Sequence, residues 1–123
     1  MGNLKVPQHF RYIIPIVKIL KGMGGSGRSS EVIDLIVKKL GISDKELLDT
    51  YKTGQSKILM QIHWARLFLV KTGYLSSPIR GIWSLTEKGI KFDLTSKGLT
   101  DLHRQNRGWR YQWFKPAAKI ENK

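Results

Sequence analysis

The sequence predicts an α+β fold that is mostly α-helical and carries one β-hairpin after its helices. Two observations predict this class. Apolar residues recur three or four positions apart in several segments before residue 73, as they do in amphipathic helices. Two short strand-like runs then flank a turn that contains proline and glycine, at residues 78–81. With 123 residues, 41% of them hydrophobic and 25% charged, the chain can bury one modest core.

The N-terminal helix is predicted over residues 8–21, directly after Pro7, which suits the first turn of a helix. Pro15 has no amide donor, so we expect it either to kink this helix or to begin its main part. The glycine-rich segment 22–30 is expected to be a flexible loop. It nearly matches a phosphate-binding loop, but Arg28 stands where that motif needs lysine and no strand precedes it, so we do not assign nucleotide binding.

Two further helices are expected in the middle of the chain. Ser29 or Ser30 is predicted to cap the first of them, because a serine hydroxyl accepts a hydrogen bond from a free amide of the first turn. Gly41 is predicted to end it. The sequence Ser-Asp-Lys-Glu at residues 43–46 is a capping box and predicts a short helix that continues to about Tyr51.

The longest helix is predicted over residues 56–72, and Gly73 is expected to end it. This helix is apolar around nearly its whole circumference, so we expect most of it to be buried. The residues predicted to face the core are Ile58, Ile62, Ala65 and Leu69. The least apolar side is either an ordinary solvated strip or a strip that faces a partner, and it carries Lys57, Met60, Gln61, Trp64 and Lys71.

The hairpin is predicted from residues 74–77 and 82–85, with Pro78 and Gly81 shaping the turn between them. This turn leaves Arg80 as an exposed charge at the tip. A helical or irregular segment follows the second strand. A helix-turn-helix followed by a hairpin is the winged-helix arrangement, in which the later helix enters the major groove of DNA. The hairpin, or wing, then reaches the DNA backbone or the minor groove.

Charge is the strongest signal in the composition. Lys and Arg number 22 against nine Asp and Glu, a net charge of +13. Five of the nine acids lie in residues 31–49, and none lies between Asp49 and Glu87. A basic chain whose acids are also segregated favours a polyanionic partner, most often nucleic acid, over a merely soluble basic surface.

Several other classes of protein are disfavoured. The chain has no cysteine, no signal peptide and no apolar run long enough to span a bilayer. We therefore expect a cytoplasmic protein that has no disulfides and does not bind a membrane. The three histidines are too far apart in sequence for a local metal motif. The few carboxylates do not form the cluster that a metal-dependent nuclease needs. We therefore expect no enzymatic activity, no cofactor and no metal.

The chain is predicted to divide into a winged-helix domain, residues 1–94, and a basic aromatic extension or linker, residues 95–123. In the extension, residues 104–115 interleave arginine and lysine with tryptophan, tyrosine and phenylalanine. Such a segment can stack on nucleic-acid bases. It can equally seal the open end of the core or contact a partner domain.

The segment 54–89 resembles the N-terminal domain of Mrr-type restriction endonucleases, and the similarity covers roughly residues 6–92. This resemblance implies a winged-helix DNA-binding domain of a modification-dependent restriction system, whose nuclease domain is separate and cleaves methylated DNA. Cleavage is therefore not expected of this chain. The matching pieces are Gly54-Gln55, Trp64-Ala65-Arg66, Leu69, Gly73-Tyr74-Leu75, Pro78-Ile79-Arg80-Gly81, Trp83 and Leu85-Thr86-Glu87-Lys88-Gly89.

The expected partner is double-stranded DNA, with methylated DNA as the specific target. Gln61 is the candidate for reading an adenine edge, because its amide pairs a donor with an acceptor. Burial is the expected state of Trp64 and Trp83, and the alternative is a contact with a modified base, for which Met60 is a further candidate. Phosphate contacts are assigned to Lys52, Lys57, Lys71 and Arg80. The complete candidate DNA-binding set is Lys52, Gln55, Ser56, Lys57, Met60, Gln61, His63, Trp64, Lys71 and Arg80.

Two alternatives to a restriction-system domain follow from the same fold. One is a small winged-helix transcription regulator, which would be a homodimer reading a palindromic site. The other is a protein-interaction domain whose basic face binds an acidic partner. Strong salt dependence of DNA binding would argue against the second alternative.

Overall fold

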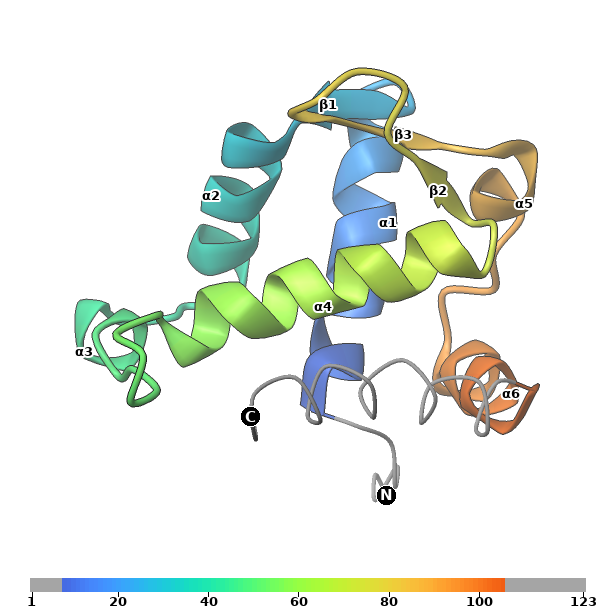
Figure 1. Cartoon of the computed structure of the whole chain (residues 1–123). Helices are drawn as coiled ribbons and strands as arrows, with labels where there is room; N and C mark the ends of the chain where they lie inside the picture. Colours follow the sequence, from blue (N-terminus) through green and yellow to red (C-terminus); the bar gives the residue numbers. More distant parts are fainter. Residues whose placement is uncertain (1–7, 106–123) are drawn as a thin grey trace, which may run out of the picture.

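The computed structural model describes residues 8–105 and has the predicted α+β, mostly helical fold (Figure 1). Its sheet has three antiparallel strands in the order β1-β3-β2. A helix-turn-helix followed by a β-hairpin is the arrangement of a winged helix. In chain order the elements are the 3₁₀ helix η1 (Gln8–Tyr12), α1 (Ile13–Gly22), β1 (Ser26–Arg28), α2 (Ser29–Lys39), α3 (Asp44–Leu47), α4 (Lys57–Lys71), β2 (Leu75–Ser76), β3 (Ile82–Leu85), α5 (Glu87–Ile90) and α6 (Ser96–Gln105).

The predicted N-terminal helix consists of two pieces, η1 and α1. Pro15 lies in the first turn of α1, so the expectation that it begins the main part of the helix is confirmed. The first four amides of an α-helix have no partner inside the helix, and the missing N–H of a proline therefore costs nothing there. The buried side chains of α1, among them Ile16, Val17 and Leu20, form the centre of the core.

The expectation that residues 22–30 form a flexible loop is wrong, because the segment contains β1. This strand pairs with β3, with Gly27 opposite Trp83. The hydroxyls of Ser26 and Ser84 lie 2.7 Å apart across the pair. Serine and glycine have low strand propensity, and the partner strand lies more than 50 residues away, so the pairing depends on a contact that no local pattern reveals.

The start of α2 also differs from the expectation. Neither Ser29 nor Ser30 is its N-cap, because the helix begins at Ser29 and its N-cap is Arg28, whose side chain makes no capping hydrogen bond. β1 runs directly into α2, and the amide of Ser29 donates instead to the carbonyl of Gly81 in the wing, at 2.8 Å. The predicted end is confirmed, since Gly41 has φ +65°.

The short helix α3 begins as predicted and ends earlier. Its capping box is confirmed, with the Ser43 hydroxyl accepting from the Glu46 amide at 3.1 Å and the Glu46 carboxylate accepting from the Ser43 amide at 3.0 Å. The helix ends at Leu47, where the sequence predicted an end at about Tyr51.

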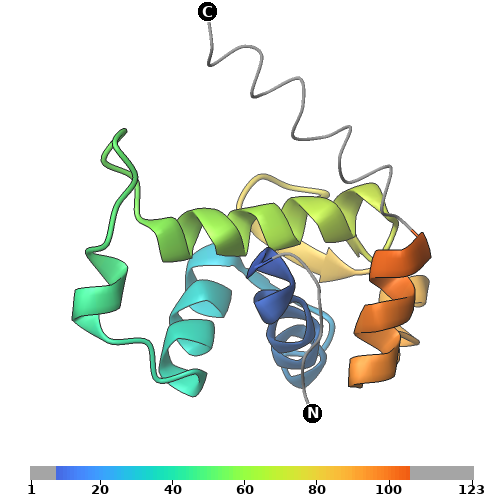
Figure 2. The ribbon, with the colours of Figure 1, turned by 90° about the horizontal axis from the view of Figure 1, so that it is seen from below.

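The long helix α4 forms within one residue of its predicted bounds. Ile62, Ala65 and Leu69 are buried as expected, together with Phe68, whereas Ile58 is only partly buried. The expectation that most of the helix is buried is wrong. α4 lies across one side of the molecule, so that one face packs on η1 and α1 while the opposite face lacks cover among the described elements (Figure 2).

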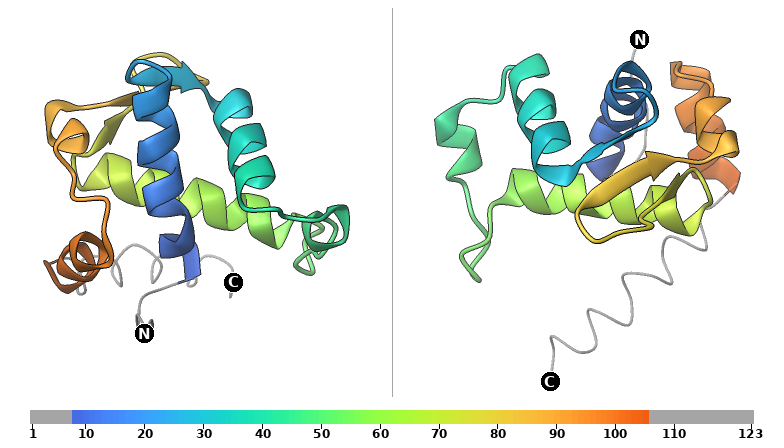
Figure 3. Two further views of the ribbon diagram at one scale, coloured as in Figure 1. Left: turned by 180° about the vertical axis from the view of Figure 1, so that it is seen from behind. Right: turned by 90° about the horizontal axis from the view of Figure 1, so that it is seen from above.

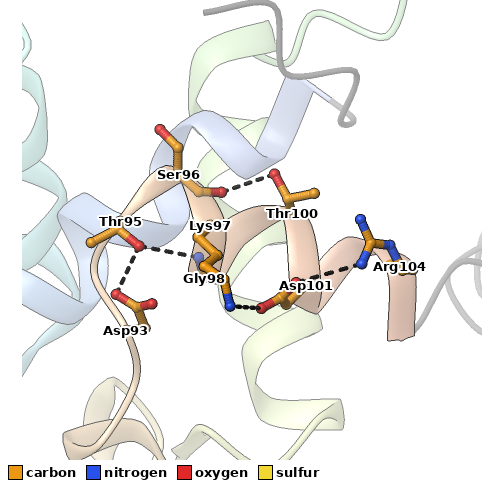
Figure 4. A network of polar contacts seen from close by, with 8 residues as sticks. All are labelled: Asp93, Thr95, Ser96, Lys97, Gly98, Thr100, Asp101 and Arg104. Atoms are coloured by element: carbon orange, nitrogen blue, oxygen red, sulfur yellow. Dashed lines mark hydrogen bonds and ion pairs between the residues drawn. The ribbon is translucent and has the colours of Figure 1, made fainter.

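The core extends past residue 94, where the sequence analysis placed the end of the winged-helix domain. Leu99 and Leu102 of α6 belong to the same hydrophobic cluster as the side chains of α1 and α4. Thr95 accepts a hydrogen bond from the Gly98 amide at 3.2 Å and donates one to Asp93 at 2.7 Å, which begins α6 at this point (Figure 4). The interleaved segment of the extension lies almost entirely outside the described residues.

Within residues 8–105, none of the helices has the length and apolar character needed to cross a membrane. The same part of the chain holds no group of three or more His, Asp or Glu side chains arranged to hold a metal ion.

Candidate nucleic-acid interface

The open face of α4 lies between two loops that rise on the same side of the molecule. One is the entry loop, residues 50–56, which leads into α4. The other is the wing tip, residues 77–81, between β2 and β3. The views from below and from above both place these loops on the side of α4 that faces away from α1 (Figures 2 and 3). The helix and the two loops form one candidate surface.

The entry loop is closed by its own backbone. Thr50 and Ser56 form an isolated antiparallel bridge. The amide of Tyr51 donates to the Gln55 carbonyl, and the amide of Gly54 donates to the Tyr51 carbonyl, both at 2.9 Å. The loop is therefore ordered. Beside the start of α4 it holds three of the candidate DNA-binding residues, the exposed Lys52 and Gln55 and the partly buried Ser56.

Aromatic and charged contacts join the entry loop to α4. The Tyr51 ring lies 6.1 Å from the Trp64 ring, and the Lys57 ammonium lies 5.6 Å from the Tyr51 ring centre. Lys57 also pairs with Asp49 at 3.6 Å. Because exposed ion pairs contribute at most about 1 kcal/mol, a phosphate can compete with Asp49 for this lysine. The hydroxyl of Ser56 is engaged as the N-cap of α4, accepting from the Leu59 amide.

The wing tip is a tight turn held at both ends. The Ile82 amide donates to the Ile79 carbonyl at 3.0 Å, and Gly81 has φ +86°, which is the third position of a type II turn. Arg66 of α4 donates to the Ser77 hydroxyl at 3.4 Å. The predicted role of Gly81 is confirmed, and Arg80 is exposed at the tip as expected.

Trp83 anchors the wing to α4 and does not face solvent. It is 3% exposed, so the expectation of burial is confirmed. The His63 ring meets it edge-on at 6.4 Å, and the Arg66 guanidinium lies 5.8 Å from its ring centre. Trp64 is partly buried against Tyr51. The two tryptophans therefore lie at opposite edges of α4. Trp64 of α4 lies toward the entry loop, and Trp83 of β3 packs at the edge toward the wing.

Arg66 is a functional candidate that the sequence analysis did not select. It contacts both Trp83 and Ser77, so it connects the open helix to the wing. Its side chain sets the position of the wing relative to α4. Two signals were present in the sequence: Arg66 lies in the stretch without acids, and it completes the Trp-Ala-Arg piece of the resemblance.

The outward residues of α4 form a ridge along the helix, three or four positions apart: Met60, His63, Leu67 and Lys71. His63 and Lys71 are exposed, and Met60 and Leu67 are partly exposed. The structure does not place Gln61 on this ridge. Gln61 lies on the flank of α4 that faces η1, where its amide donates to the Gln8 side chain at 3.2 Å. It would have to leave Gln8 before its amide could bind a base edge.

Three of the candidate phosphate-binding cations form no ion pair with another described residue. Among the described residues, ion pairs form at Lys57, Lys91, Lys97 and Arg104. Lys52, Lys71 and Arg80 take part in none of these pairs. Lys52 and Arg80 lie on the two flanking loops, the entry loop and the wing tip, and Lys71 is the last residue of the ridge, so positive charge lies on both sides of the ridge and at its C-terminal end.

The pKa of His63 is lowered, first by burial of its ring and second by the charge of Arg66. Because the pKa of His63 is lower in the folded protein than the value of about 6.5 in the unfolded chain, the unfolded chain takes up a proton more readily. The folded state is therefore favoured most where His63 is neutral, above about pH 6.5, and it loses this stability as the pH falls below that value. A nearby phosphate would act in the opposite direction and favour the charged form.

We therefore expect DNA binding to tighten as the pH is lowered from about 7.5 to 5.5, because protonation of His63 adds a charge on the ridge. Fluorescence anisotropy with a labelled duplex measures this. In the His63→Gln variant the increase should be smaller. An identical pH profile for both proteins would show that His63 does not face the DNA.

Comparison with known proteins gives one family. Residues 10–96, most of the chain, match the family model described as the Mrr N-terminal domain. The matched segment runs from η1 to the first residue of α6, so it includes the open helix and both flanking loops. No curated protein and no solved structure matches the chain.

Proposed function

Because the chain belongs to the Mrr N-terminal domain family, we propose that it is the DNA-targeting domain of a modification-dependent restriction system. In this proposal the ridge of α4 enters the major groove of duplex DNA, and the entry loop and the wing tip hold the backbone on either side. Cleavage belongs to a separate nuclease domain. The single observation that carries the proposal is the open face of α4 between two ordered loops on the same side (Figure 2).

The dimensions of α4 support this placement. Its 15 residues are about 22 Å long, and the major groove of B-DNA is about 12 Å wide and admits one α-helix. The ridge residues lie on the side of the helix that would face the base edges. The loops that flank the helix would then lie near the phosphates that border the groove.

The charges support a DNA backbone contact. Lys52 and Arg80 flank the ridge, and Lys71 ends it. These three take part in none of the described ion pairs, and the ion pair of Lys57 is with the exposed carboxylate of Asp49. A phosphate contact fixes the orientation of a protein on DNA without reading its sequence. Cations distributed in this way around α4 would contact phosphates on both sides of the groove and so fix the orientation of the helix in it.

The chemistry of the ridge favours reading a methyl group. Met60 and Leu67 offer apolar surface, and an apolar side chain in the major groove contacts the methyl group of thymine or 5-methylcytosine. His63 can donate a hydrogen bond to an acceptor on a base edge or to a phosphate, and protonation turns both of its ring nitrogens into donors. Because a methyl group adds only apolar surface, direct preference for it is limited to about 1–3 kcal/mol.

Binding to three matched duplexes tests the proposal: one unmodified, one with N6-methyladenine and one with 5-methylcytosine. We expect one modified duplex to bind about 5- to 150-fold more tightly than the unmodified one. Met60→Ala should reduce this ratio, whereas Ile90→Ala, which changes an exposed isoleucine of α5, should leave it unchanged. Equal affinity for all three duplexes would refute modification reading and leave duplex binding as the function.

A further inference from the structure

We propose that Ile79 is a wedge that the wing tip inserts between two base pairs from the minor groove, so that the bound DNA is bent. This inference rests on the proposed function, because it requires α4 to lie in the adjacent major groove. It specifies what the wing recognises: a base step that is easily unstacked.

The exposure of Ile79 is the first observation. Its side chain is 67% exposed, and among the described large hydrophobic residues only Leu48 exceeds it, at 77%. Tight turns favour Gly, Pro, Asn, Asp and Ser, each for a backbone reason, and isoleucine has no such role. The side chain of Ile79 is therefore required neither by the turn nor by the core, and it exposes a branched apolar group to solvent.

The rigidity of the wing tip is the second observation. Pro78 restricts the backbone immediately before Ile79. The type II turn closes immediately after it, and the Gly81 carbonyl accepts from the Ser29 amide at 2.8 Å, which ties the turn to α2. Arg66 ties the other end of the tip to α4 through Ser77. A wedge must keep its shape while it separates stacked bases, and a tip held from two helices meets that requirement.

The position of the wing tip is the third observation. It rises on the same side as the ridge of α4, so a duplex that holds α4 in its major groove brings a neighbouring minor groove toward the wing (Figures 2 and 3). Arg80 follows Ile79 directly, so it can hold a phosphate at the edge of the same groove. Isoleucine is among the side chains that proteins insert between base steps from this groove.

The partner implied is a duplex with a flexible pyrimidine–purine step, TA or CA/TG, at the wing position. Such steps unstack with the least cost. The wing would then contribute sequence preference without any hydrogen bond to a base.

Measurement of the DNA bend tests the wedge, by energy transfer between dyes at the two ends of a duplex bound by the full chain. We expect the wild type to bend the duplex by about 20° or more. The Ile79→Ala variant should lose the bend and bind about tenfold more weakly, and Ile79→Leu should retain the bend. The Ile90→Ala variant is the matched control, because it removes the same atoms from an isoleucine that is 54% exposed on α5.

A second readout locates the unstacked step. 2-Aminopurine placed in turn at each position of the duplex should brighten at one step with the wild type and at none with Ile79→Ala. Binding without a bend, or the same bend with Ile79→Ala, would overturn the wedge and leave the proposed function standing. Absence of any duplex binding by the wild type would overturn both.

Discussion

Raising the salt concentration from about 50 to 200 mM is expected to weaken duplex binding by this chain about 150-fold. Each phosphate that a lysine or arginine neutralises releases counterions, and contributes about −0.9 to the slope of log affinity against log salt. Lys52, Lys57, Lys71 and Arg80 would together give a slope of about −3.6. Anisotropy titrations of one labelled duplex at four or five salt concentrations measure this slope.

Single substitutions show which residues contribute to the slope of log affinity against log salt. Arg80→Ala should reduce it by about 1 and weaken binding to all sequences alike. Lys18→Ala removes an exposed lysine from α1, which lies on the other side of α4, and should leave the slope unchanged. A slope near zero would contradict a phosphate-binding surface, and would favour the alternative in which the basic face binds an acidic protein.

Gly89→Ala is expected to destabilise the fold by about 3 kcal/mol, which is a large share of the 5–15 kcal/mol that holds a typical domain folded. Gly89 is buried in α5, and a Cβ there would overlap the carbonyl oxygen of Tyr74 and lie 3.1 Å from Leu85. That carbonyl already accepts the Thr86 amide at 3.1 Å, and the Thr86 hydroxyl donates to the Gly73 carbonyl. Because these hydrogen bonds hold the backbone around Tyr74, its carbonyl cannot easily move away from an added Cβ at residue 89.

Gly22→Ala is the matched control, since Gly22 ends α1 and a Cβ there would have no atom within 4 Å. It should stabilise the protein by about 0.5–1 kcal/mol, because alanine favours helix and loses less freedom on folding. Urea denaturation of both variants and the wild type measures the difference. If Gly89→Ala unfolds at the same urea concentration as the wild type, α5 does not pack against the start of β2 in solution.

The helices α1 to α4 are predictable from local patterns in the sequence. The capping box at residues 43–46, the end of α2 at Gly41 and the bounds of α4 each depend on interactions within one or two turns of the chain. The hairpin turn is local in the same sense, because its signal lies in Pro78 and Gly81. Net charge and its segregation are also properties of the sequence, so the preference for a polyanionic partner required no structure.

The candidate surface was predictable in part. The sequence predicts this surface on the long helix and the wing tip, and His63, Lys71 and Arg80 are exposed there. Gln61 is predicted to read a base because its amide pairs a donor with an acceptor and because it lies on the least apolar side of the helix, with Lys57 and Trp64. Spacing does not show that η1 packs against that flank and that Gln8 accepts from its amide. The role of Arg66 also depends on contacts with Trp83 and Ser77, which lie more than ten residues away in the sequence.

The helices α1 to α4, the hairpin and the sign of the charge follow from the sequence, because each is specified by residues that are neighbours along the chain. Only the tertiary structure decides that β1 exists, that one face of α4 stays open, and that the core continues into α6. The physical reason is the same in all three cases. Burial and strand pairing are set by segments distant in sequence, and an apolar residue is buried only where another element reaches it.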